Sequence, residues 1–125
     1  MFDIDLFKQI NDRFGHKLGD DVLVEVCSLV KSQIRSSDFL ARWGGEEFLI
    51  ILPGQSLESA KNTAEKLRQM IENYNFPKTI KLTVSFGVTE FLEGDTLQEI
   101  FARSDHNLYQ AKSLGRNRTV DDQGR

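Results

Sequence analysis

The chain has 125 residues, which is the size of one compact domain and excludes a two-domain enzyme. Hydrophobic residues make up 39% of it, nine of them Phe, so it can bury a sizeable core. Sixteen Lys and Arg against nineteen Asp and Glu give a formal charge of -3, which argues against a basic module that coats nucleic acid.

Neither redox chemistry nor a membrane segment is indicated. The single cysteine, Cys27, excludes an internal disulfide and a thiolate-rich zinc site. The longest purely apolar run, residues 48–52, is far shorter than the roughly 20 residues of a membrane helix, and no signal-peptide pattern is present. We expect a soluble, cytoplasmic domain without direct membrane contact, and any anchor would belong to an upstream part of the parent protein.

The sequence pattern of the first third of the chain predicts a strand and a helix. Residues 1–5 are the end of a short strand, and residues 14–19 form a loop. The following helix has apolar residues at three- and four-residue intervals: Val22, Leu23, Val26, Leu29, Val30 and Ile34. Cys27 lies near this stripe and is interpreted as a small buried hydrophobe.

A hairpin and a second helix follow. Residues 39–43 and 46–52 are strand-like, and Gly44-Gly45 between them permits the positive φ of a two-residue turn. The two strands should therefore pair antiparallel. Ser56 is a predicted N-cap for a helix with an apolar stripe at Leu57, Ala60, Ala64, Leu67 and Ile71.

The last third predicts a strand, a helix and a final short strand. Apolar residues alternate over residues 80–88, so one face of that strand is core. Thr96 and Glu99 match a capping box, and the helix they open ends at Gly115. Its inward residues are predicted to be Leu97, Ile100, Phe101, Leu108 and Ala111. Residues 116–120 form the last strand, and residues 121–125 a polar tail.

The predicted order is β-α-β-β-α-β-α-β. This is an α+β fold: a ferredoxin-like core with one additional helix and strand, in which helices pack on an antiparallel-rich central sheet. Residues 1–120 should fold as one domain. Because this architecture hosts many functions, the function must be argued from the site.

Acidic residues concentrate at two places that this topology brings together. Asp3 and Asp5 end the first strand, and Glu46 and Glu47 follow the glycine pair. If the first strand lies beside the hairpin, Asp3 and Glu46 project toward one point, where their charges would repel without a divalent cation. Carboxylate oxygens suit Mg²⁺ when water and phosphate complete the shell. The alternative is that these are solvated turn and strand-end acids.

The glycine pair and its neighbours carry a family resemblance. Residues 44–48, Gly-Gly-Glu-Glu-Phe, resemble the signature of the GGDEF family, the diguanylate cyclases that make cyclic di-GMP from two GTP molecules. Four further segments resemble the family's other motifs, in order and at its spacing. The five segments are residues 44–48 (GGEEF), 2–12 (FDIDLFKQIND), 14–20 (FGHKLGD), 85–88 (SFGV) and 111–117 (AKSLGRN). The resemblance spans residues 2–120 and implies the α+β palm core of nucleotidyl cyclases.

The resemblance implies a metal and phosphate site. Asp3, the carbonyl of Ile4 and Glu46 would hold Mg²⁺, with two ions in each half-site and Mn²⁺ as an alternative ion. Glu46 would receive the 3′-hydroxyl proton, and Glu47 would either assist the metal or face solvent. Lys8 would stabilise charge that builds on the phosphates. The further phosphate ligands it implies are Lys112 and Arg116.

The resemblance also implies a guanine site. Asn11 and Asp20 would recognise the base, His16 would contact the substrate, and Gly44 and Gly45 would let the nucleotide approach the backbone. The alternative for Asp20 is an N-cap for a helix that begins near residue 21. Lys8 and Lys112 have the alternative of being ordinary solvated lysines.

Two further functions follow from the resemblance. Arg35 and Asp38 match a product-inhibition site for cyclic di-GMP, because five residues separate Asp38 from Gly44. Lys66 or Arg68 would help there; otherwise Arg-x-x-Asp is a helix-end charge pair. One domain supplies one GTP half-site, so catalysis would need a second copy of the domain as a homodimer.

The pattern departs from the family at its start. The family's entry helix and the beginning of its first strand are absent, so the chain is expected to be truncated inside that strand. Two other functions remain open. One is a sensor module that binds GTP or cyclic di-GMP without turnover, and the other is a different nucleotidyl-transfer enzyme on the same scaffold.

Overall fold

A computed structural model describes all residues, 1–125. The elements are β1 (Phe2–Ile4), α1 (Phe7–Phe14), α2 (His16–Gln33), β2 (Phe39–Gly44), β3 (Glu47–Ile51), α3 (Leu57–Glu72), β4 (Val84–Gly87), α4 (Leu97–Ser113) and β5 (Thr119–Val120). A single 3₁₀ turn, η1 (Pro77–Thr79), precedes β4. The sheet order is β2-β3-β1-β4-β5, with β1 antiparallel to both of its neighbours and β5 parallel to β4. The predicted ferredoxin-like core with an additional helix and strand is confirmed.

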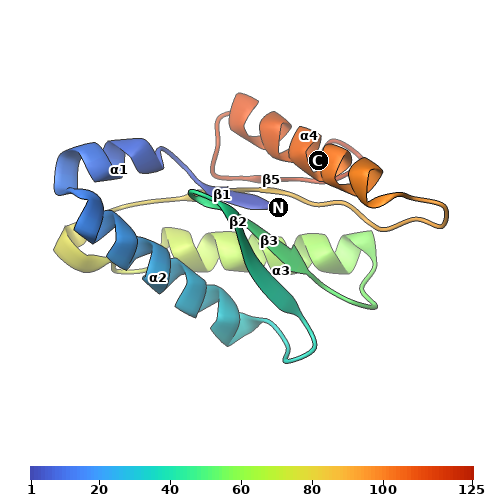
Figure 1. Cartoon of the computed structure of the whole chain (residues 1–125), viewed down its shortest axis with the longest axis horizontal. Helices are drawn as coiled ribbons and strands as arrows, with labels where there is room; N and C mark the ends of the chain where they lie inside the picture. Colours follow the sequence, from blue (N-terminus) through green and yellow to red (C-terminus); the bar gives the residue numbers. More distant parts are fainter.

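The sheet separates two layers of helices, with α4 on one face and α2 and α3 on the other (Figure 1). Side chains of β1 alternate between these faces. Phe2 and Ile4 enter the main core, where the Phe2 ring lies 5.0 Å from that of Phe48 and 4.9 Å from that of Phe86. Asp3 and Asp5 therefore point to the α4 side of the sheet. None of the helices combines the length and hydropathy needed to cross a bilayer.

Two predictions for the start of the chain are wrong. The structure has an additional helix, α1, and the predicted loop at residues 14–19 is mostly the first turn of α2. Phe7, Ile10 and Phe14 are spaced for one face of a helix, but the run is too short for its periodicity to be clear. Gly15, with φ 92°, forms the only break between the two helices.

The strand predicted at residues 80–88 is shorter in the structure, at Val84–Gly87. Ile80 and Leu82 are buried as expected, but they have no strand partner. The reason is that β1 ends at Ile4, and the left-handed backbone of Leu6 (φ 56°) turns the chain into α1. Apolar alternation predicted the burial, while the length of the neighbouring strand decided where the ladder ends.

The hairpin turn is displaced by one residue from the prediction. Gly44 pairs with Glu47, so the two turn residues are Gly45 and Glu46, and only Gly45 has positive φ (34°). A bulge between Arg42 and Gly44 absorbs the extra residue. Arg42 Nε donates to the Gly45 carbonyl at 2.7 Å across the turn. As a result, Glu46 occupies the turn itself.

The two predicted helix N-caps are confirmed, whereas the predicted burial of Leu97 is wrong. The Ser56 hydroxyl accepts from Ser59 N–H at 3.2 Å, and the Thr96 hydroxyl accepts from Glu99 N–H at 3.1 Å. Leu97, however, is 71% exposed, because α4 meets β4 two turns later, where Ser104 and Leu108 contact Gly87. The expected polar tail begins with a buried residue, Asp121.

Candidate active site

Strand pairing brings the predicted acidic residues together. Asp3 of β1 lies opposite Glu47 of β3, and Ile4 N–H donates to the carbonyl of Glu46 at 3.4 Å. Asp3 is only 5% exposed. Its pKa is raised to about 6, chiefly by burial; Lys112 lowers it, and the negative charges of Glu46 and Glu47 contribute to the increase. Three carboxylates from β1 and the hairpin therefore share one electrostatic environment.

The Asp3 carboxylate is only half satisfied. Its Oδ2 accepts from the ammonium of Lys112, which reaches it from the last turn of α4. Its Oδ1 is buried without a hydrogen-bond partner. Such an oxygen, beside two further carboxylates, would be stabilised by a cation. No three metal-ligating side chains converge in the structure, so a bound ion would need water, phosphate or a backbone carbonyl to complete its shell.

Asp5 has a different environment from Asp3, although the two lie on the same face of the chain. Its Oδ1 accepts from the Ser85 hydroxyl at 2.6 Å, and its Oδ2 accepts from the Thr83 hydroxyl at 2.7 Å and from Asn117 N–H at 3.0 Å. Sequence reasoning grouped Asp5 with Asp3 and did not find these partners. The available signal was Ser85, a polar residue inside an apolar strand.

The residues predicted to recognise guanine lie where α1 packs on α2. Asn11 Oδ1 is buried and has no partner. It lies against Gly19, where a Cβ would come within 1.8 Å of it, so a side chain there would occupy the place of the amide. His16 and Asp20 are exposed and lie one turn apart on the first turns of α2. The N-cap alternative for Asp20 is wrong, because α2 begins at His16.

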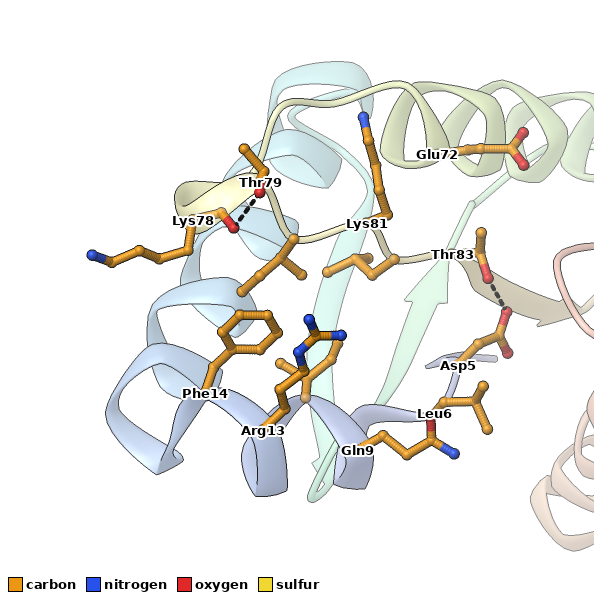
Figure 2. Close-up of a pocket in the computed structure, with 13 residues that line it drawn as sticks. Asp5, Leu6, Gln9, Arg13, Phe14, Glu72, Lys78, Thr79, Lys81 and Thr83 are labelled. Atoms are coloured by element: carbon orange, nitrogen blue, oxygen red, sulfur yellow. Dashed lines mark hydrogen bonds between the residues drawn. The ribbon is translucent and has the colours of Figure 1, made fainter.

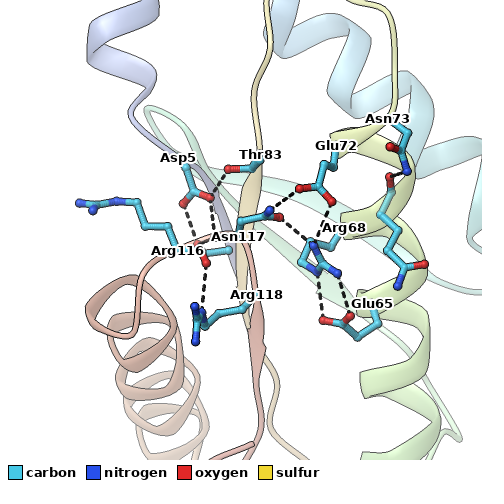
Figure 3. A network of polar contacts seen from close by, with 11 residues as sticks. Asp5, Glu65, Arg68, Glu72, Asn73, Thr83, Arg116, Asn117 and Arg118 are labelled. Atoms are coloured by element: carbon cyan, nitrogen blue, oxygen red, sulfur yellow. Dashed lines mark hydrogen bonds and ion pairs between the residues drawn. The ribbon is translucent and has the colours of Figure 1, made fainter.

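The two remaining cationic residues, Lys8 and Arg116, have no ionic partner within the chain. Lys8 is exposed on α1 and forms no ion pair. Arg116 follows α4 in the left-handed region (φ 64°), and its guanidinium forms no hydrogen bond within the chain. Figure 3 shows this side chain pointing away from the neighbouring polar network. Both side chains are thus available to a ligand.

Arg35 and Asp38 form a close pair between α2 and β2. Arg35 Nη2 lies 2.9 Å from Asp38 Oδ1, and Arg35 N–H and Nε donate to Asp38 Oδ2 at 2.7 and 3.3 Å. These hydrogen bonds hold the pKa of Asp38 below its usual range. Arg35 Nη2 also donates to the carbonyl of Pro53 at 2.8 Å. Of the two suggested helpers, Arg68 is held by Glu65, and Lys66 is exposed.

A hollow of about 640 Å³ lies elsewhere in the molecule. It is bounded by α1, the η1 turn and the segment leading into β4 (Figure 2). Arg13 and Phe14 line it, and Asp5 with Thr83 closes one end. Apart from Asp5, none of the acidic, guanine-recognising or phosphate-binding residues described above lines it. The candidate active site therefore lies outside this hollow, along the end of β1 and the hairpin.

Comparison with known proteins decides the family. The family model described as "Diguanylate cyclase, GGDEF domain" matches residues 1–118. The chain belongs to the GGDEF family. In this GGDEF domain the hairpin motif reads Gly-Gly-Glu-Glu-Phe, with Glu in the third position of the family name.

Relatives and solved structures agree with this assignment. The GGDEF domain is 40% identical to the response regulator PleD of Caulobacter vibrioides and 41% identical to the diguanylate cyclase VdcA of Vibrio cholerae, in each case over 96% of the chain. It spans only 28% and 37% of the lengths of these two proteins.

Two solved structures have folds that closely resemble that of this domain. The active GGEEF domain of a diguanylate cyclase from Vibrio cholerae superimposes with a TM-score of 0.91 at 41% identity, covering 96% of this chain and 78% of that one. The GGDEF domain of DgcB from Caulobacter crescentus, solved in complex with c-di-GMP, gives 0.93 at 32% identity, covering 98% and 75%.

Proposed function

We propose that this domain is a diguanylate cyclase that condenses two GTP molecules into cyclic di-GMP and pyrophosphate. Its family membership and its similarity to named diguanylate cyclases support the reaction. The observation that carries the proposal is the buried Asp3 carboxylate, which has one unpartnered oxygen and lies beside Glu46 and Glu47. An acidic cluster of this kind suits a magnesium nucleotide better than a purely structural role.

The ion would be held by oxygens of the chain together with water and phosphate. Asp3 Oδ1 and Glu46 would be the first ligands, the carbonyl of Ile4 would be the third, and Glu47 would assist. Mg²⁺ fits this donor set, since it commonly takes one or two carboxylates together with waters and substrate phosphates, and Mn²⁺ would be accepted as well. When bound, the metal polarises the α-phosphate and neutralises charge on the leaving pyrophosphate.

The chain's own cations would bind the triphosphate. Lys112 now neutralises Asp3, and arrival of a divalent ion would free its ammonium for the phosphates. Arg116 and Lys8 carry no intramolecular ion pair and would join it. The positive charge needed for phosphate binding therefore comes from both ends of the sequence.

Guanine would be held between α1 and α2. The unpartnered Asn11 Oδ1 can accept from the base, and the Asp20 carboxylate can accept from its N–H groups. His16 would add a contact one turn away. At Gly44 and Gly45 a Cβ would meet no atom within 4 Å, so the hairpin leaves open space for the nucleotide.

Two domains would be required for turnover. Each would present one GTP, and Glu46 would receive the proton of the 3′-hydroxyl that attacks the α-phosphate of the other nucleotide. A second copy of this chain is thus the proposed partner. Cyclic di-GMP would inhibit by binding Arg35 and Asp38, where the half-exposed guanidinium can meet phosphate.

The experiment is incubation with Mg²⁺ and GTP or ATP, followed by chromatography of the products. We expect cyclic di-GMP from GTP, and loss of synthesis in Glu46→Gln with an unchanged unfolding temperature. Glu58→Gln, an exposed acid on α3, is the matched control and should retain synthesis. A cyclic mononucleotide would indicate a different cyclase, and tight GTP binding without product would indicate a sensor. Synthesis by Glu46→Gln would remove Glu46 from catalysis.

A further inference from the structure

A polar network surrounds the turn that joins α4 to β5, and none of the proposed steps uses it (Figure 3). Asn117 lies at its centre. The Asn117 amide side chain donates to Glu72 and accepts from Arg68 Nη1 at 2.8 Å, both on α3. Its backbone N–H donates to Asp5 of β1 at 3.0 Å and to the Ser85 hydroxyl of β4 at 3.1 Å. Three elements distant in sequence therefore hold one residue.

The backbone at this turn needs such support. Arg116 and Asn117 are consecutive non-glycine residues with positive φ, 64° and 47°. This region is sterically unfavourable for residues with a Cβ, so it persists only where surrounding contacts determine it. Arg116 N–H donates to the carbonyl of Ala111 at 3.0 Å, which closes the helix end. The next residue, Asn117, is held by its side-chain contacts to α3 and by the hydrogen bonds of its N–H to Asp5 and Ser85, of which only Asp5 offers a carboxylate acceptor.

Asp5 is suited to holding this turn and unsuited to holding a metal. It is 7% exposed, and its two oxygens accept from three donors. Asp3, two residues earlier, has the unpartnered oxygen instead. Two carboxylates on the same face of the chain thus have different environments and different roles.

We propose that Asp5 is a positioning residue for Arg116. By holding Asn117 N–H, it fixes the left-handed turn from which the Arg116 guanidinium points away from the network (Figure 3). Lys112, one turn earlier on α4, already pairs with Asp3 of β1. This inference rests on the proposed function, in which both cations bind the triphosphate.

The test is a double-mutant cycle between Asp5→Asn and Arg116→Ala. In Asp5→Asn the hydroxyls of Thr83 and Ser85 can reverse their hydrogen bonds, but Asn117 N–H cannot. Wherever the new NH₂ faces it, Asn117 N–H loses its carboxylate acceptor and keeps only the neutral Ser85 hydroxyl. The readout is the dissociation constant of the α,β-methylene analogue of GTP in Mg²⁺, measured by calorimetry. Binding does not require turnover, so this readout is independent of catalysis.

We expect Asp5→Asn to weaken binding of the analogue about tenfold in the wild-type background and by less than about twofold when Arg116 is already Ala. KM for GTP should rise more than kcat falls. Asp105→Asn, an exposed acid on α4, is the matched control and should change neither value. Equal weakening by Asp5→Asn in both backgrounds would overturn the inference, because a general structural defect acts without Arg116.

A second variant keeps the inference testable if Asp5→Asn does not fold. If Asp5→Asn lowers the unfolding temperature too far for binding studies, Asn117→Ala enters the same cycle. It keeps the backbone hydrogen bond to Asp5 and removes the side-chain contacts to Arg68 and Glu72, so we expect it to weaken binding by less than about twofold. A tenfold weakening by this variant would assign the turn to those side-chain contacts and overturn the role of Asp5. The proposed function fails separately: a wild-type domain that binds the analogue but makes no cyclic di-GMP contradicts catalysis and leaves the binding cycle intact. A wild-type domain that does not bind the analogue contradicts both.

Discussion

Gly87 is the point of closest approach between β4 and α4, and replacing it with Ala should destabilise the domain. A Cβ at Gly87 would lie 2.4 Å from Leu108 N and 2.4 Å from the Ser104 carbonyl oxygen. These contacts are about 1 Å short of the 3.4 Å at which ordinary van der Waals contact begins. Because both atoms belong to the backbone of α4, no side-chain rotation relieves the overlap, and the whole helix must move.

The expected cost of Gly87→Ala is about 3 kcal/mol, the upper end of what overpacking usually costs. For a domain of this size that corresponds to an unfolding temperature lower by about 10 °C. Because α4 carries Lys112, binding of GTP should weaken as well.

Thermal and urea denaturation would measure the effect. Gly44→Ala is the matched control for stability, since a Cβ there meets no atom within 4 Å and its φ is not positive. It should change the free energy of unfolding by no more than about 0.5 kcal/mol. If both variants unfold at the wild-type temperature, α4 does not pack on β4 as described.

Two other predictions follow from the charged residues. The pKa of Asp3, raised by burial to about 6 from an ordinary 3.8, means that the folded chain binds this proton more tightly than the unfolded chain. In EDTA, the free energy of unfolding should therefore fall by roughly 3 kcal/mol from this residue as pH rises through about 4 to 6. Asp3→Asn should lack this decrease in urea denaturation at a series of pH values, and identical pH profiles of the two proteins would contradict it. Arg35→Ala should weaken binding of cyclic di-GMP at least about tenfold in calorimetry, because the only cation at Asp38 is lost; an unchanged dissociation constant would place the product elsewhere.

The local sequence pattern and the family resemblance were sufficient to predict most of the fold, and they also supplied the candidate site residues. The caps at Ser56 and Thr96 and the apolar stripe of α2 depend on neighbours within a few residues, so they can be read along the chain. The order of strands and helices followed, and with it the proximity of the first strand to the hairpin. The roles proposed for Lys8, Asn11 and Arg116 remain predictions, since they depend on a ligand.

Tertiary structure decided the strand register and the position of the hairpin turn, because both depend on pairing between segments that are distant in the sequence. The register that sets Asp3 opposite Glu47, and the bulge that places Glu46 in the turn, arise from hydrogen bonding between β1, β2 and β3. β4 ends its ladder where β1 turns away at Leu6, which no pattern within residues 80–88 could show.

The separation of Asp3 from Asp5 has the same origin. In the sequence they are equivalent acids two residues apart, and only the contacts made by residues 83–85, 112 and 117 give one a hydrogen-bonded environment and leave the other an open oxygen. A carboxylate's chemistry is set by the donors and charges around it, and these come from segments that meet only when the chain folds. The sequence alone predicted which residues the site should contain, and folding determined which of them have unpartnered polar groups.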